Sequence, residues 1–208
     1  MGYIMTDKSN NQVTICGEIV NEGVLAYEKD GEKFYEIAVK TKQSELPIPV
    51  IISEKLLANV ENCKGSIIGI HGELHSYAKR VAGGRTRMIL KVFANSVYDS
   101  KDNTNSFSVF GYICKPPFLQ KQEDGQVNVS VLLSVERDRN ISDYVFFSVT
   151  ENLVEKLETF VVGDVLIANG FLRACSYKEQ VLGKATFDKT KCELVVVKVE
   201  KRDKEFLS

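Results

Sequence analysis

The strongest constraint on the fold is an internal repeat: residues 13–98 and 107–199 carry the same local signals in the same order. The earlier matches are offset by 94 residues and the later ones by 97 or 98, so the second copy is slightly longer. The matched pairs are Gly17 and Gly111, Asp30-Gly31 and Asp124-Gly125, Ser53-Glu54 and Thr150-Glu151, and Gly72 and Gly170. Solenoid units are shorter, typically about 20–50 residues. The repeat therefore predicts two small domains.

Composition is that of an ordinary globular protein, with 44% hydrophobic and 26% charged residues in a chain of 208. We expect a first domain at 12–99, a polar linker at 100–105, a second domain at 106–200, and flexible termini at 1–11 and 201–208. No apolar run reaches the roughly 18 residues of a membrane-spanning helix, and the N-terminus lacks a signal-peptide pattern. We expect no membrane association.

Cysteine and histidine usage argues against a metal centre. The five cysteines form no CxxC pair, and the two histidines, His71 and His75, share one face of a predicted strand without further ligands. We expect both histidines to be structural or surface residues. The odd cysteine count and the lack of an export signal favour a reducing compartment, so we expect a cytoplasmic protein without a metal or cofactor.

Each copy has the order strand, strand, strand, helix, strand, strand. A glycine inside the first strand indicates a bend, an Asp-Gly pair indicates a hairpin turn, and Ser53 or Thr150 is placed to cap a short helix. This is the order of an OB-fold, a small five-stranded barrel. The prediction is an all-β protein with one short helix per repeat, in two tandem OB-folds. An unrelated pair of small β-barrels is the alternative.

Longer segments of both copies carry a family resemblance. In the second copy they are Pro116-Pro117-Phe118, residues 144–153, Val162-Gly163-Asp164-Val165, residues 169–173 and Ser176-Tyr177. In the first copy they are residues 49–56, residues 72–77 and residues 90–94. Each motif alone is weak, but their order occurs twice and covers nearly the whole chain. The chain resembles the bacterial single-stranded DNA-binding proteins, in a tandem OB-fold form.

The resemblance implies a mechanism and an assembly. Single-stranded DNA would lie across the barrel face, with bases stacked on aromatic rings and phosphates neutralised by Lys and Arg, independently of sequence. The expected roles are DNA replication, recombination or repair, without enzymatic activity. Because members with one barrel per chain assemble four barrels, a homodimer is expected here. The chain ends without the acidic tip through which such proteins recruit enzymes, so we expect no recruitment by that route. The sequence also has no tryptophan, so Tyr and Phe must stack.

One predicted hairpin of the first copy is strongly basic. Residues 74–98 contain no Asp or Glu and five cations. We expect four of these cations, which flank the turn at 82–84, to contact phosphates: Lys79, Arg80, Arg85 and Arg87. The alternative is a solvated hairpin whose charges only aid solubility.

Aromatic residues supply the expected stacking positions. Tyr77 and Tyr177 lie at matching points after the fourth-strand glycine and are expected to stack on bases; packing on the barrel is the alternative. Phe146 and Phe147 point to opposite faces of a strand, and we assign Phe147 to the interface, although a one-residue register shift exchanges them. The remaining candidates are Lys115, Phe118, Lys121, Arg137, Arg139, Tyr144, Arg173 and Lys178. We expect the first copy to bind by charge and the second by stacking.

Two other functions of different kinds stay open. Primosomal protein N has the same barrel and acts partly as a replication adaptor, which would bind single-stranded DNA or RNA more weakly. An RNA-binding module is the third possibility, although no feature of the sequence indicates 2′-hydroxyl recognition. An enzyme is disfavoured, because the sequence has no nucleophile–base motif, phosphate-cradling glycine loop or metal cluster.

Overall fold

The computed structural model describes residues 10–60, 63–80, 86–121, 127–138, 141–150, 153–180 and 186–202. The first half contains β1 (Asn11–Ile19), β2 (Val24–Lys29), β3 (Glu32–Lys40), β4 (Ile48–Ser53), α1 (Glu54–Leu57), β5 (Ile67–Arg80) and β6 (Thr86–Asp99). The second half contains β7 (Asn105–Ile113), β8 (Phe118–Lys121), β9 (Val127–Asp138), β10 (Ile141–Thr150), α2 (Val154–Glu158), β11 (Val165–Gln180) and β12 (Thr186–Arg202).

The element order of the first half is repeated in the second, which confirms tandem OB-folds of the all-β class with one short helix each. The first strand of each barrel is interrupted, so it appears as β1 and β2 in one copy and as β7 and β8 in the other. The other strands follow the predicted order. β12 continues to Arg202, two residues beyond the expected end of the second domain at 200.

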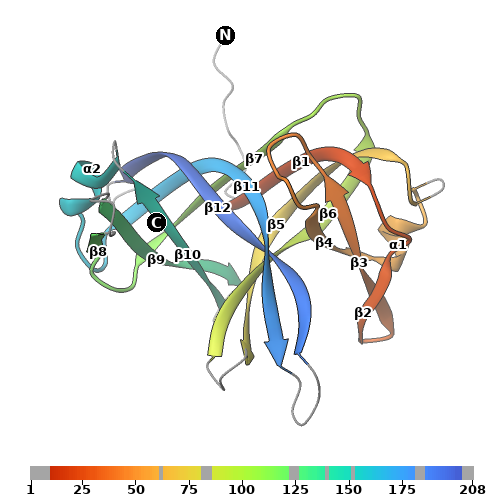
Figure 1. Ribbon diagram of the computed structural model, residues 1–208, viewed down its shortest axis with the longest axis horizontal. Helices are drawn as coiled ribbons and strands as arrows, with labels where there is room; N and C mark the ends of the chain where they lie inside the picture. The colour runs from red at the N-terminus through yellow and green to blue at the C-terminus, as the bar shows by residue number, and fades with distance from the viewer. Residues whose placement is uncertain are drawn as a thin grey trace.

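Both halves belong to one continuous sheet. β1 pairs antiparallel with β7 at the centre, with Val13 opposite Phe107. Figure 1 shows the two barrels as lobes on either side of this centre, where the β5–β6 and β11–β12 hairpins cross and extend toward the same side. The polar segment between β6 and β7 is short, because β6 ends at Asp99 and β7 begins at Asn105. The two long hairpins lie side by side between the lobes, since Cys192 of β12 pairs with Leu90 of β6.

The repeated glycines have a steric cause. A Cβ atom at Gly17 would lie 2.1 Å from the carbonyl oxygen of Lys40, and one at Gly111 would lie 2.4 Å from that of Ser134. At Gly170 the corresponding distance, to the carbonyl oxygen of Val195, is 1.9 Å. Contacts this short are not tolerated, so each position requires glycine for the close approach of two strands. The pairs found in the sequence thus mark the crossing points of both barrels.

The local signals of the two copies had different outcomes. Asp30 and Gly31 both have positive φ, 52° and 79°, which confirms the tight turn between β2 and β3. Ser53 caps α1 by accepting a hydrogen bond from the Leu56 N–H at 3.3 Å, as predicted. The expected cap at Thr150 is wrong: α2 begins at Val154 behind Leu153, whose side chain makes no capping hydrogen bond. The turn at 124–125 lies outside the described residues.

Both histidines are surface or packing residues. His71 stacks on Tyr98 with ring centroids 4.8 Å apart, and His75 stacks on Phe93 at 4.2 Å. Within the described ranges, no group of three or more His, Cys, Asp or Glu side chains could hold a metal ion. None of the helices in the described part of the chain is both long enough and apolar enough to span a bilayer.

Candidate nucleic-acid interface

The second barrel carries a group of exposed aromatic side chains on its outer face. Its sheet places Phe118 beside Ser130 and Ser148, and places Tyr112 beside Ser134 and Tyr144, so these residues share one face. Four large aromatic rings are exposed there, and we call them the aromatic surface: Tyr112, Phe118, Tyr144 and Phe146. Phe118 is 61% exposed and Tyr144 44% exposed, so their ring faces are open to a ligand.

The assignment of Phe147 to this surface is wrong. Phe147 is 2% exposed and belongs to the hydrophobic core, whereas Phe146 is 52% exposed. The alternation along β10 explains the result, because Val145, Phe147 and Val149 all point inward. The polar Ser148 marks the other face, and Phe146 shares that face. This signal was present in the sequence and would have settled the register.

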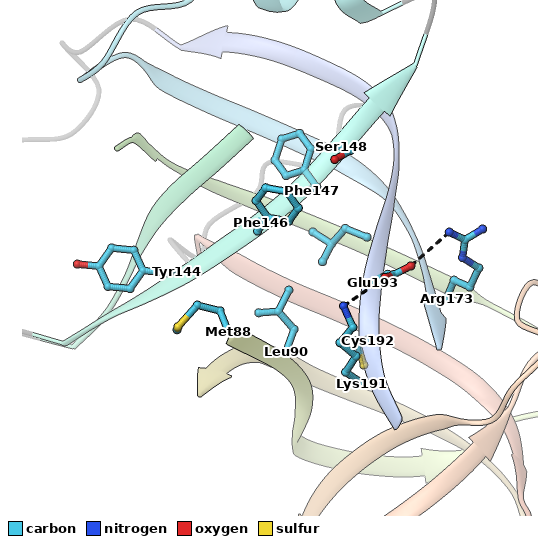
Figure 2. Close-up of a pocket in the computed structure, with 11 residues that line it drawn as sticks. Met88, Leu90, Tyr144, Phe146, Phe147, Ser148, Arg173, Lys191, Cys192 and Glu193 are labelled. Carbon is cyan, nitrogen blue, oxygen red and sulfur yellow. Dashed lines mark hydrogen bonds and ion pairs between the residues drawn. The ribbon is translucent and has the colours of Figure 1, made fainter. Parts of the chain in front are cut away.

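A pocket lies beside the aromatic surface, at the seam between β10 and β12. We call it the seam pocket, and its lining residues are Met88, Leu90, Tyr144, Phe146, Phe147, Ser148, Arg173, Lys191, Cys192, Glu193 and Leu194. Figure 2 shows the β10 residues on one side of this seam and the β12 residues on the other. The pocket therefore brings three predicted site residues into one place: Tyr144, Arg173 and the buried Phe147.

Charged side chains at the seam form a chain of ion pairs. The Glu193 carboxylate lies 3.3 Å from the Arg173 guanidinium and 3.2 Å from the Lys191 ammonium. Burial opposes ionisation of Glu193, but hydrogen bonding from Cys175 and the neighbouring cations outweighs it and lowers the pKa of the carboxyl. Glu193 is therefore an anion at neutral pH, held between two cations.

The other predicted cations lie at several places. Lys115 and Lys121 are exposed at either end of the segment that contains β8. Lys79 and Arg87 are exposed and face each other across the β5–β6 hairpin. Lys178 lies 3.6 Å from Asp188 across the β11–β12 hairpin, with both side chains largely in solvent.

Arg137 is exposed but is held in an ion pair. Its guanidinium donates to both carboxylate oxygens of Asp143, with Nε 2.7 Å from Oδ2. Asp143 is fully buried and also accepts from the backbone N–H and the hydroxyl of Ser76, at 2.6 and 3.1 Å. Because Ser76 lies on β5, this pair joins the second barrel to the first. Arg137 therefore has a structural role, and its predicted place in a binding groove stays a prediction.

The two predicted stacking tyrosines do not occupy equivalent positions. Tyr77 lies five residues after Gly72, whereas Tyr177 lies seven residues after Gly170. Tyr177 is 8% exposed and packs against Ile89 of the first barrel, so it holds the two hairpins together and offers no face to a base. Tyr77 is half-buried, and burial raises its pKa.

The first barrel has an aromatic row that the sequence did not indicate. Phe34 stacks on Tyr27 at 4.9 Å and lies 6.5 Å from Phe93, whose ring also meets His75 and Tyr77. Tyr27, at one end of the row, is 36% exposed, whereas Phe34, Phe93, His75 and Tyr77 are only partly exposed. Tyr27 and Phe34 pair across the β2–β3 hairpin. The ring of Phe93 comes from β6, distant in the chain, and no local spacing in the sequence brings it to Phe34.

Some predicted residues cannot be placed. Arg85 and Arg139 lie outside the described residues, as does the side chain of Arg80.

Comparison with known proteins supports the fold. No protein-family model and no curated protein matches this sequence. Among solved structures, the chain is similar to the wild-type single-stranded DNA binding protein from Thermus aquaticus, with a TM-score of 0.66 and 16% identity over 93% of each chain. A deletion variant of that protein gives a TM-score of 0.68 and 17% identity, over 94% of this chain and 96% of the other. The likeness is one of fold, and it spans both barrels.

Proposed function

We propose that this protein binds single-stranded DNA independently of sequence and protects it during replication, recombination or repair in the cytoplasm. The observation that carries the proposal is the aromatic surface of the second barrel, whose four exposed rings lie on one face of an OB-fold. Water-exposed rings of this kind offer π-faces that any base can stack on, at about 1–3 kcal/mol per base. The shared fold with a protein that is named for this activity supports the same function.

Cations near the aromatic surface can neutralise the phosphates of a bound DNA strand. Lys115 and Lys121 lie near Phe118, and Arg173 and Lys191 lie at the seam pocket beside Phe146. Single-stranded DNA whose bases stack on the aromatic surface would therefore have positively charged side chains on two sides. The net charge of −1 argues against a strongly basic, purely electrostatic binder, so phosphate contacts would have to come from local groups of cations.

Tyrosine fluorescence tests this proposal directly, because the chain has eight tyrosines and no tryptophan. Stacking of bases on Tyr112 and Tyr144 should quench the emission on addition of oligo-dT. Tyr112→Leu/Tyr144→Leu should abolish most of the quenching, whereas Tyr98→Phe, at a ring stacked on His71, should not. Emission that does not change on addition of DNA would contradict stacking.

The assembly is part of the same proposal. A homodimer would bring together four barrels, as the family resemblance implies, with residues 12–99 and 106–200 of each chain as its OB domains. Light scattering should then give twice the 23.3 kDa mass of one chain at micromolar concentration. A strict monomer under those conditions would remove the four-barrel assembly and leave DNA binding by one chain untouched.

A further inference from the structure

The two barrels differ in how their sheets close. In the first, β4 pairs with β6 in parallel, with Val50 opposite Val92 and Ile51 opposite Phe93, and this pairing completes a ring of five strands. In the second, the equivalent strands are β10 and β12, and among the described residues no backbone pairing joins them. The seam pocket lies in that place. The repeat therefore has a closed seam in one copy and an open one in the other.

The walls of the seam pocket suit a flat apolar group. Its floor is made of the buried side chains Leu90, Phe147 and Leu194. Its rim carries the exposed Phe146 and Met88, a ring and a thioether that both favour contact with aromatic surfaces. The cavity volume is about 190 Å³, below the range of roughly 300–1,000 Å³ that is usual for whole small-molecule ligands. It has room for a single ring system.

The charged end of the pocket can hydrogen-bond to such a ring. Glu193 accepts from Arg173 and Lys191, one at each carboxylate oxygen, and also from the Cys175 thiol. A carboxylate has about four acceptor positions, so roughly one position is left for a ligand. Arg173 is more than half exposed and has further N–H donors beyond the one that faces Glu193. The pocket thus presents an acceptor and a donor next to each other above an apolar floor.

We propose that the seam pocket takes one nucleobase of the bound strand, and that Glu193 makes it prefer bases with an exocyclic amino group over thymine. The proposal rests on the proposed single-strand binding, and it adds a base preference at one nucleotide position to an interface that is otherwise independent of sequence. A carboxylate accepts a hydrogen bond from an amino group such as cytosine N4, whereas thymine carries the carbonyl oxygen O4 at the corresponding position, which the carboxylate repels. Arg173 can donate to the neighbouring ring acceptor or carbonyl.

A nucleobase fits this pocket better than a phosphate group does. A phosphate would lie against the Glu193 carboxylate and over an apolar floor, and both contacts are unfavourable. Arg173 and Lys191 line the pocket, and both side chains are partly exposed to solvent. They can therefore contact the phosphate of the same nucleotide. The base would enter the seam while its phosphate stays outside.

Competition anisotropy with the full chain at neutral pH tests the pocket, with oligo-dC and oligo-dT of equal length as probes. Wild-type protein should bind oligo-dC about fivefold or more tightly than oligo-dT, the ratio that one good base contact provides. Glu193→Gln should narrow this ratio to nearly one, because an amide can donate to thymine as well as accept from cytosine. Glu200→Gln is the matched control, since Glu200 is also ion-paired on β12 but does not line the pocket.

A second pair of variants tests the cavity itself. Ser148→Trp should fill the seam and abolish the preference for oligo-dC, while both probes still bind. Ser142→Trp places the same side chain on the same face of β10, outside the pocket lining, and should keep the preference. Thermal melting of both variants confirms that each is folded.

The outcomes separate the pocket from the proposed function. Tight binding of both probes with no preference, unchanged in Glu193→Gln and Ser148→Trp, overturns the base pocket and leaves single-strand binding in place. Failure of the wild-type protein to bind either probe overturns both.

Discussion

The Asn105 side chain forms two hydrogen bonds with the backbone of Leu172: the Leu172 N–H donates to Oδ1 at 2.9 Å, and Nδ2 donates to the Leu172 carbonyl at 2.8 Å. Asn11 holds Leu74 in the same way, at 2.9 and 2.8 Å. In each barrel the strand that pairs with β5 or β11 turns away to join the other barrel, and the carboxamide takes the place of the missing backbone partner. A buried asparagine with this pair of hydrogen bonds therefore lies at each end of the β1–β7 pairing.

Removal of either carboxamide should destabilise the whole molecule. Both asparagines are buried, so Asn105→Ala or Asn11→Ala leaves a backbone N–H and a carbonyl without partners. We expect each variant to lose about 2 kcal/mol or more of unfolding free energy, measured by urea denaturation. Asn95→Ala removes an exposed asparagine and should cost much less. Equal losses at all three sites would contradict a special role for the junction.

Phe146 and Phe147 should give opposite phenotypes. Phe146→Ala removes an exposed ring and should weaken binding to oligo-dT by about 1–3 kcal/mol, with little change in stability. Phe147→Ala empties part of the core and should cost about 3–5 kcal/mol of unfolding free energy. Anisotropy and thermal melting of the two variants separate the effects. If Phe146→Ala bound DNA as tightly as the wild type, the aromatic surface would not be the stacking site.

Acid stability should depend on Asp143. Burial opposes its ionisation, but the Arg137 guanidinium and the Ser76 N–H outweigh burial and hold the pKa of the carboxyl below its ordinary value. A folded-state pKa that is depressed adds stability at neutral pH, and this stability is lost as the pH falls below about 4. Arg137→Met should cost about 3–5 kcal/mol, because it leaves a buried unpaired charge.

The pH profile distinguishes this pair from a simple packing effect. In Arg137→Met, burial without a cation should raise the pKa of Asp143, so the loss of stability should begin at a higher pH than in the wild type. Asp143→Asn removes the titrating group and should flatten that part of the profile. The measurement is unfolding free energy between pH 3 and 7, and parallel profiles for wild type and Arg137→Met would count against the ion pair.

Arg87 is the described cation that best tests phosphate contact by the β5–β6 hairpin. Arg87→Gln should lower the slope of log affinity against log salt by about one, if the side chain neutralises one phosphate. Lys198→Gln, on β12 and paired with Glu200, is the control that should leave the slope unchanged. An unchanged slope in Arg87→Gln would remove the described part of this hairpin from the binding path.

The repeat allowed the fold to be predicted, since paired glycines, the Asp30-Gly31 turn and the Ser53 cap are local signals with local causes. The candidate site could be predicted less well from the sequence. Phe147 was misassigned although the Ser148 pattern was available, whereas the burial of Tyr177 depends on Ile89 of the other barrel. The Arg137–Asp143 pair likewise serves a contact with Ser76, and the open seam depends on which strands fail to pair. No local pattern in the sequence reports such contacts between distant segments.

The most direct test of single-strand binding is an anisotropy titration of labelled oligo-dT and of a duplex of equal length, each at two salt concentrations. Tight binding of oligo-dT, strong preference over the duplex and weaker binding at the higher salt are the predicted results, because stacking needs unpaired bases and phosphate contacts are screened by salt. Equal affinity for the duplex, or no binding of oligo-dT at low salt, would contradict the account.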